Sequence, residues 1–283
     1  MGVHPAGDER STHRGPGAEY ADVREYQGSE DARLIDWNLT ARSDRAFVRE
    51  SHPERGIDVW LLVDASASLD WGTTRALKRN AAQDVVDLVT LLLSRHGNRV
   101  GAMVFDTEVR RIFGLTAGRQ ARLGLVARLG TEGTRPAAPG RTQLGATLAR
   151  AGRVIRRPSV LVVISDFLVD DGWQKAMKTL AIRHDVVAAR ISDPREGDIP
   201  NVGIVTFEDP ETGAQVEVDT TSRKFRQRYR AAAAEQRSRL LADFKEARVR
   251  VLEVTTAEPV SDQLVAFLRG RQRRRGAPLR LAR

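Results

Sequence analysis

Short apolar runs alternate along the chain with longer amphipathic segments. Residues 57–64, IDVWLLVD, are mostly apolar and rich in β-formers, and the run stops at the polar stretch DASAS. This pattern predicts a buried strand that ends in a polar loop. Residues 73–95 predict a helix that stops before Gly97, because apolar side chains recur there at helical spacing. Those apolar positions are Leu77, Ala81, Val85, Leu88 and Leu92.

The same alternation continues through the rest of the chain. We expect further strands at residues 100–105, 109–113, 159–165, 185–191 and 249–254. The segments between them predict helices at 119–129, 143–155, 171–183, 222–245 and 260–268, and a hairpin of strands 203–207 and 215–219 turned by DPETG. Because parallel neighbours need crossover connections, this order predicts an α/β fold with a doubly wound, mostly parallel sheet and a small β-hairpin insertion.

The length of 283 residues allows one large core with extensions. We expect a main domain at 57–268, with a hairpin and helix insertion at about 200–247. Residues 18–56 are expected to pack on this core, after a flexible tail at 1–17. Residues 269–283 hold seven arginines and no acid, which predicts a disordered tail; without it the net charge of +9 falls to +2.

Composition points to the cytoplasm. The chain has no cysteine, which excludes disulfides and thiolate-bound zinc and suits a reducing compartment. The longest apolar candidate, residues 85–93, is interrupted by Asp87 and is too short to span a bilayer. Residues 1–17 are polar and lack the apolar segment of a secretory signal. We therefore expect a cytoplasmic protein without an integral membrane segment.

Five oxygen-bearing side chains are predicted to meet at one edge of the sheet. Asp64, Ser66 and Ser68 alternate after the first buried strand, Thr142 begins a helix, and Asp166 ends a neighbouring strand. Such ligands suit Mg²⁺ or Mn²⁺ and disfavour zinc. Two carboxylates only balance a divalent charge, and if one of them acts through water the metal remains electrophilic and has room for an Asp or Glu carboxylate from a partner.

These residues resemble a known metal site. DASAS at 64–68, Thr142 in GRTQLGATL and Asp166 in VVISDF are similar to the metal-ion-dependent adhesion site (MIDAS) of von Willebrand factor type A domains, with Phe167 where many of those domains have Gly. The resemblance implies a metal on Asp64, Ser66, Ser68, Thr142 and Asp166.

A second resemblance covers roughly residues 18–270. The segment 24–50, VWLLVDASASLDWG, SDPRE at 192–196 and FEDPETGAQVEVDT at 207–220 resemble the bacterial family called domain of unknown function 58. Its members resemble adaptors encoded beside MoxR-type AAA+ ATPases, which implies a partner ATPase and a role in complex assembly or maturation. Many longer members have amino-terminal membrane helices, so peripheral membrane association stays open.

Several of these residues also have purely structural interpretations. Asp and Ser after strands often form turns and helix caps, and Thr142 could simply cap a helix. The segment Asp36-Trp37-Asn38, with Arg42, Arg49 and Glu50, could face a partner; we favour packing of Trp37 and Phe47 beneath the sheet. His52, His96 and His184 are not at metal-ligand spacing. The basic stretch 223–230 is typical of a solvated helix face.

Three functions compete at this stage. We favour a non-enzymatic, metal-dependent protein-interaction module. A metal-dependent phosphohydrolase is the alternative, but no second Asp follows Asp64 by two residues, and the chain has no GK[ST] loop for ATP. Nucleic-acid binding through the basic helix and the arginine tail ranks third, and we expect no specific nucleic-acid partner.

Overall fold

The computed structural model describes residues 22–26, 35, 37–43, 45–50, 56–93, 97–169 and 172–273. The chain divides into two compact units, Met1–Glu54 (the N-terminal unit) and Arg55–Arg283 (the main unit). The tail predicted at 1–17 and the last ten positions of the predicted arginine tail lie outside the described residues. Among the residues described, no helix combines the length and apolarity needed to cross a membrane.

The N-terminal unit contains a small antiparallel pair of strands. β1 (Asp22–Glu25) pairs with β2 (Phe47–Glu50), and the short helix α1 (Trp37–Thr40) precedes β2. The backbone N–H of Phe47 donates to the hydroxyl of Thr40 at 3.1 Å, which ties α1 to β2. Trp37 is 67% exposed. The packing of residues 18–56 on the core, and of Trp37 beneath the sheet, stays a prediction, and Asp36 lies outside the described residues.

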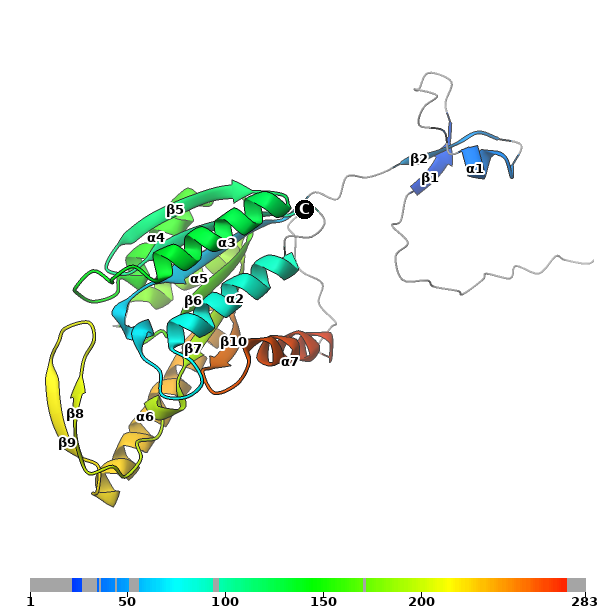
Figure 1. Ribbon diagram of the computed structural model, residues 1–283. Helices are drawn as coiled ribbons and strands as arrows, with labels where there is room; N and C mark the ends of the chain where they lie inside the picture. The colour runs from blue at the N-terminus through cyan, green and yellow to red at the C-terminus, as the bar shows by residue number, and fades with distance from the viewer. Residues whose placement is uncertain are drawn as a thin grey trace, which may run out of the picture. The chain divides into compact units, whose positions relative to one another are not determined.

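A six-stranded sheet forms the centre of the main unit (Figure 1). Its order is β10-β7-β6-β3-β4-β5; all neighbours are parallel except β4 and β5, which pair antiparallel at one edge. The strands are β3 (Asp58–Asp64), β4 (Arg99–Phe105), β5 (Val109–Thr116), β6 (Val160–Ser165), β7 (Asp185–Ser192) and β10 (Arg250–Thr255). The predicted doubly wound, mostly parallel α/β sheet is confirmed.

Helices cover both faces of this sheet (Figure 1). α2 (Lys78–Leu93), α3 (Arg119–Gly133) and α7 (Val260–Arg273) pack on one face. α4 (Leu144–Val154), α5 (Trp173–Arg183) and α6 (Arg223–Glu246) pack on the other. β3 is buried along its whole length because alternate side chains enter the two cores.

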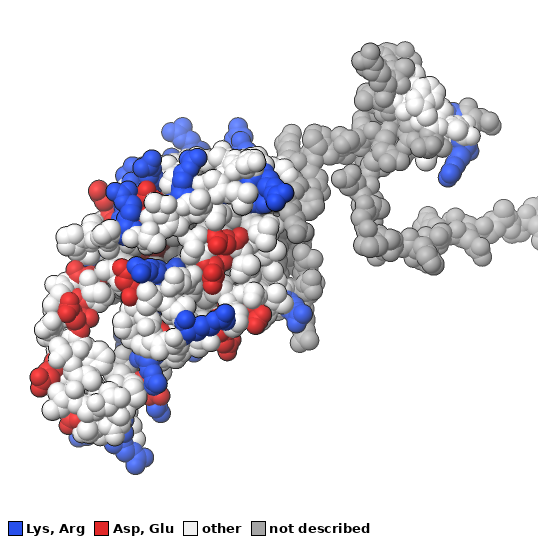
Figure 2. Space-filling view, viewed as in Figure 1, with Lys and Arg blue, Asp and Glu red and all other residues white. Residues whose placement is uncertain are grey.

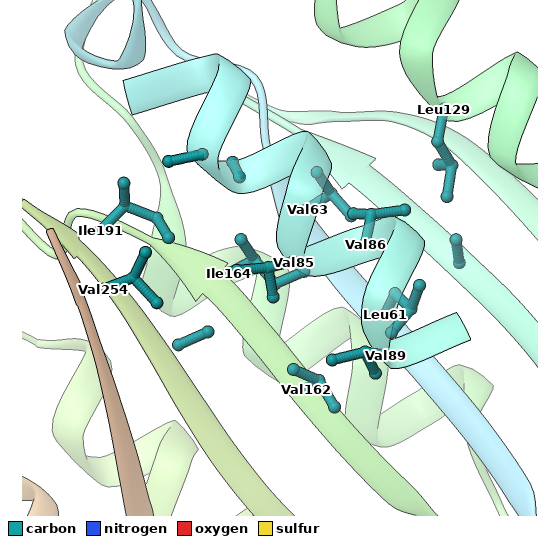
Figure 3. Close-up of a cluster of buried hydrophobic side chains, with 14 of the residues drawn as sticks. Leu61, Val63, Val85, Val86, Val89, Leu129, Val162, Ile164, Ile191 and Val254 are labelled. Atoms are coloured by element: carbon teal, nitrogen blue, oxygen red, sulfur yellow. The ribbon is translucent and has the colours of Figure 1, made fainter. Parts of the chain in front are cut away.

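The first core shows this alternation directly (Figure 3). Leu61 and Val63 of β3 point toward Val85, Val86 and Val89 of α2. Trp60 and Leu62, the intervening residues of β3, belong to the opposite core. The central strand is therefore fixed from both faces, which holds its carboxyl end, Asp64, in a defined place.

Three helix boundaries differ from prediction by more than two residues. One of them is the end of α3, which lies at Gly133 rather than at residue 129. α2 begins at Lys78 rather than residue 73, because the hydroxyl and the backbone N–H of Thr73 donate to Asp193 at 2.6 and 2.9 Å. Residues before α2 therefore form a loop that contains the short 3-10 helix Ala67–Asp70. α7 continues to Arg273 rather than ending at residue 268, so the helix includes the first five residues of the segment predicted as an arginine tail.

The predicted hairpin forms a separate two-stranded ribbon. β8 (Ile204–Glu208) pairs antiparallel with β9 (Gln215–Asp219), with Phe207 opposite Val216. In Figure 1 this ribbon stands apart from the main sheet, at the amino-terminal end of α6. The turn between the strands carries the DPETG sequence at 209–213.

Candidate metal-binding site

The predicted site residues lie where the winding of the sheet changes direction. β3 and β6 are adjacent and parallel. The chain leaves β3 toward α2 on one face and leaves β6 toward α5 on the other. In such sheets, ligands bind beyond the carboxyl ends of strands at this point. Asp64 ends β3 and Asp166 directly follows β6, so the two predicted carboxylates share this edge.

Asp64 is a buried carboxylate with both oxygens in hydrogen bonds. Its side chain is 3% exposed. Oδ1 accepts from the backbone N–H of Ser66 at 2.9 Å, and Oδ2 accepts from the Ser165 hydroxyl at 2.6 Å. Burial, followed by the negative charge of Asp166, raises the pKa of Asp64 to about 7. A cation beside Asp64 would offset both the cost of burying its charge and the repulsion from Asp166.

Ser66 and Ser68 lie side by side after β3. Ser66 has an extended backbone and precedes the 3-10 helix Ala67–Asp70. The two hydroxyl oxygens are 3.1 Å apart. The predicted alternation along DASAS therefore brings these two side chains together, next to the Asp64 carboxylate that holds the backbone of Ser66.

Thr142 is held beside the DASAS loop through the end of β4. The backbone N–H of Ala65 donates to Phe105 O at 2.8 Å, and that of Gln143 donates to Asp106 O at 2.9 Å. Phe105, the last residue of β4, and Asp106, the next residue, thus hold the DASAS loop and the Thr142 loop side by side. The first residue before α4 is Gln143, and it makes no side-chain cap. The Thr142 hydroxyl donates instead to Glu211 Oε1 at 2.5 Å, so the interpretation that Thr142 caps the helix is wrong.

Asp106 also positions the Thr142 loop through its side chain. Its Oδ2 accepts from the backbone N–H of Ala138 at 2.9 Å and from Arg110 Nε at 2.6 Å. Burial works to raise the pKa of Asp106, but the bonds from Arg110, Ala138 and Glu108 outweigh it and lower this pKa. Sequence reasoning missed this residue, although an Asp directly after a buried strand was an available signal.

Asp166 is nearly inaccessible and makes two kinds of contact. Its Oδ1 accepts from the backbone N–H of Leu168 at 3.0 Å, and its Oδ2 accepts from Lys78 Nζ at 2.7 Å. The first contact is the turn-forming role that an Asp after a strand often has. The second is an ion pair in which both side chains are at most 2% exposed.

Phe167 occupies a backbone conformation that favours glycine, with φ of 57°. The ring is buried and packs edge-to-face on Phe244 at 4.9 Å between centroids, and on Trp173 at 5.7 Å. This packing on α5 and α6 stabilises the strained backbone. The loop after β6 therefore has a left-handed residue at the position where many von Willebrand type A domains have Gly.

Lys78 and Glu196 are the main site-adjacent residues that sequence reasoning missed. Lys78 Nζ lies 2.6 Å from Glu196 Oε1, besides its contact with Asp166. Burial lowers the pKa of Lys78, but the charges of Asp166 and Glu196 outweigh it and raise this pKa overall. Glu196 belongs to the SDPRE segment at 192–196, which resembles the DUF58 family but for which the sequence predicted no physical role.

Asp193 gives the SDPRE segment a structural role. It closes a capping box with Glu196 around the 3-10 helix Pro194–Glu196. Its carboxylate also accepts from Thr73 in the loop before α2, and from the Thr256 hydroxyl at 2.6 Å. The carboxyl end of β7 therefore organises the loop that carries the predicted metal ligands.

The chain matches the family model described as "Protein of unknown function DUF58" over residues 22–239. The chain belongs to this family. It is 34% identical over 269 residues to an uncharacterized protein of Mycobacterium tuberculosis (strain H37Rv). The alignment covers 94% of this chain and 84% of that relative. The resemblance stated from the sequence is thus confirmed for the DUF58 family.

Solved structures align more weakly with this DUF58 chain. An aerotolerance-related membrane protein from Bacteroides fragilis is 16% identical, with a TM-score of 0.48, over 74% of this chain and 96% of that protein. The SpRpn10 VWA domain is 13% identical, with a TM-score of 0.42, over 74% of this chain and 93% of the domain. At these values the likeness carries no conclusion about function.

The donor set of the DUF58 site fits a hard divalent cation. All five predicted ligands offer oxygen, which Mg²⁺ and Mn²⁺ prefer. Adjacent oxygens in an octahedron with bonds of about 2.0–2.1 Å are about 2.9 Å apart, close to the separation of the Ser66 and Ser68 hydroxyls. The described residues contain no metal-type cluster of three or more His, Cys, Asp or Glu side chains. The predicted set has only two carboxylates, and metal binding stays a prediction.

His184, the one histidine among the described residues, directly precedes β7 and takes no part in this site. His184 is buried beside β7, where its Nδ1 has no hydrogen-bond partner. Burial, followed by the nearby charge of Arg183, lowers the pKa of His184. His52 and His96 lie outside the described residues.

Proposed function

We propose that this DUF58 chain is a non-enzymatic protein-interaction module that binds Mg²⁺ or Mn²⁺ on Asp64, Ser66, Ser68, Thr142 and Asp166 and captures a carboxylate of a partner protein. The observation that carries the proposal is the buried pair of carboxylates Asp64 and Asp166, placed next to the paired hydroxyls of Ser66 and Ser68 at the carboxyl edge of the sheet.

Charge balance supports a cation at this edge. The Lys78 ammonium faces both Asp166 and Glu196, and Asp64 lies near enough to Asp166 for its pKa to rise. The Lys78 ammonium is thus shared by two carboxylates, with Asp64 next to one of them, and a divalent ion would offset the remaining negative charge.

Each residue would have a simple role around such an ion. Asp64 and Asp166 supply the charge, and the hydroxyls of Ser66, Ser68 and Thr142 supply neutral oxygens. The bound ion would supply an electrophilic position for an incoming carboxylate. The Ser165 hydroxyl donates to Asp64, and Asp193 accepts from the backbone N–H of Thr73; these two bonds would keep the ligands in place.

The partner is a protein with an accessible Asp or Glu. By its family resemblance, we propose a MoxR-type AAA+ ATPase, for which this chain would act as an adaptor in complex assembly or maturation. The cytoplasmic location, with peripheral membrane association left open, belongs to the same proposal.

Phosphohydrolase chemistry is less well supported. The residue two after Asp64 is Ser66, which is no general acid. Lys78 is a buried cation near the site, but its ammonium is held by two carboxylates and is not free for a phosphate.

Nucleic-acid binding also has little support. Arg226 of α6 donates to the carbonyl of Thr221 at 2.9 Å, and Arg230 pairs with Asp198 at 2.7 Å. Acidic and basic side chains are interspersed over the face of the main unit seen in Figure 2.

A pull-down with the AAA+ ATPase, in Mg²⁺ and in EDTA, tests this function. We expect the wild type and the exposed control Glu246→Gln to retain the ATPase in Mg²⁺ only, and Asp64→Ala and Asp166→Ala to lose it in both conditions. Retention that is equal in Mg²⁺ and EDTA would contradict the proposal.

A further inference from the structure

The turn of the β8–β9 hairpin is built to present one carboxylate. The side chain of Asp209 accepts from the backbone N–H of Glu211 at 2.9 Å and from the Thr212 hydroxyl at 2.6 Å. Gly213, with φ of 71°, donates its N–H to Asp209 O at 2.7 Å. Glu211 is half-buried, whereas the other residues of the DPETG turn are exposed.

Glu211 reaches the candidate metal site. Its Oε1 accepts from the Thr142 hydroxyl at 2.5 Å, and its Oε2 accepts from the backbone N–H of Thr142 at 3.3 Å. The Glu211 carbonyl accepts from the N–H of Gly140 at 3.3 Å. The hairpin tip is therefore fastened to the loop that supplies a predicted metal ligand, some 70 positions away in sequence.

The position of Glu211 matches the role expected of a partner. A metal on the five predicted residues needs one more oxygen donor, and an acidic side chain is the preferred one. Glu211 already accepts a hydrogen bond from the hydroxyl of one predicted ligand, which places its carboxylate next to that ligand.

Apart from the contacts of Glu211, the hairpin is only loosely packed. One face of the ribbon is apolar, formed by Val205, Phe207, Val216 and Val218. Phe207 and Val216 remain 41% and 59% exposed, so this face makes no tight core contact. A two-stranded ribbon of this kind is only marginally stable by itself.

We propose that Glu211 is an intramolecular ligand of the metal site: its carboxylate fills the position that a partner carboxylate needs, and the partner must displace the hairpin to bind. This inference rests on the proposed function. It adds a regulatory consequence, because the affinity for any partner is lowered by the stability of the contact between Glu211 and Thr142.

Bound Mn²⁺ gives a direct test, because the relaxation rate of water protons reports the waters that remain on the ion. We would compare the wild type with Glu211→Ala, Glu211→Gln and the control Glu217→Ala, which lies on an exposed part of β9. Sodium acetate serves as the carboxylate probe. All four proteins would be titrated with Mn²⁺ alone and then with acetate.

The proposal predicts that Glu211→Ala and Glu211→Gln gain one exchangeable water. With one of the five predicted ligands acting through a water, the wild-type ion keeps that water and the ion in each variant holds two, so the relaxivity should be about twofold higher in the variants. Acetate should lower this relaxivity toward the wild-type value, and should leave the wild type and Glu217→Ala nearly unchanged.

Two contrary outcomes are distinguishable. If all four proteins bind Mn²⁺ with the same relaxivity and the same response to acetate, Glu211 is not a ligand, and the proposed metal-dependent function stands. If none of them binds Mn²⁺, the proposed function fails, and the role of Glu211 fails with it.

Discussion

Lys78 Nζ lies 2.7 Å from Oδ2 of Asp166, so the first residue of α2 is an ion-pair partner of the residue that follows β6. α2 follows β3 and α5 follows β6, and these two helices cover opposite faces of the sheet. This buried pair therefore joins the two halves of the fold at the point where the candidate metal site lies.

Lys78→Met should destabilise the protein strongly. The substitution leaves Asp166 and Glu196 as buried carboxylates without their cation, a loss that costs about 3–5 kcal/mol in comparable pairs. Urea unfolding measures the difference. Lys178→Met is the matched control, because its pair with Glu246 is exposed and should contribute less than about 1 kcal/mol. Equal effects of the two substitutions would contradict the structural role of Lys78.

The free energy of unfolding should depend on pH through Asp64. Burial and Asp166 raise the folded-state pKa of Asp64 to about 7, above the ordinary value of 3.8. Between these values the folded protein binds a proton that the unfolded chain releases, so this contribution to stability is full below pH 3.8 and is lost as pH rises to about 7.

Asp64→Asn should remove most of this loss, because Asn stays neutral at every pH. From about pH 4 to about pH 7, the wild type should lose more free energy of unfolding than the variant, by on the order of 4 kcal/mol at most in total, as measured in EDTA by urea unfolding. Parallel curves for the two proteins would show that Asp64 titrates normally.

Asp193→Ala should loosen the loop before α2. The substitution removes the bonds that Asp193 accepts from Thr73 and Thr256, and opens the capping box with Glu196. We expect a loss of about 3 kcal/mol in unfolding free energy and faster amide hydrogen exchange in residues 71–77. Unchanged exchange there would mean that Asp193 does not hold this loop.

Phe167→Gly tests whether the unusual loop after β6 depends on packing or on the backbone. Glycine would relieve a cost of about 1 kcal/mol at φ of 57°, but would lose the contacts with Phe244 and Trp173. Loss of a buried Phe costs about 3–5 kcal/mol, so we expect a net loss of about 2–4 kcal/mol. Thermal unfolding measures it; a more stable variant would contradict this account.

The sheet could be predicted from sequence because its signals are local. Residues 59–63 form a continuous apolar run that is typical of a strand buried on both faces, and the DASAS, Thr142 and Asp166 positions follow strands or precede a helix. The topology then places these side chains at one edge without further information.

Other parts of the site depend on contacts between distant segments. Nothing in the sequence around Lys78 indicates that this lysine is 2% exposed, because its partners Asp166 and Glu196 lie about 90 and 120 positions further along. Glu211 likewise resembles any acidic residue of a polar turn. Only the packing of the hairpin tip against the Thr142 loop gives it a role.

Calorimetric titration of Mg²⁺ and Mn²⁺ into protein first stripped with EDTA tests the central claim most directly. Ser66→Ala removes one proposed ligand, and Ser238→Ala, on the exposed side of α6, is the matched control. We predict one ion bound per chain in the wild type and in Ser238→Ala, with affinity at least about tenfold weaker in Ser66→Ala. No binding by the wild type, or equal affinity in all three proteins, would contradict a metal site at the carboxyl edge of this sheet.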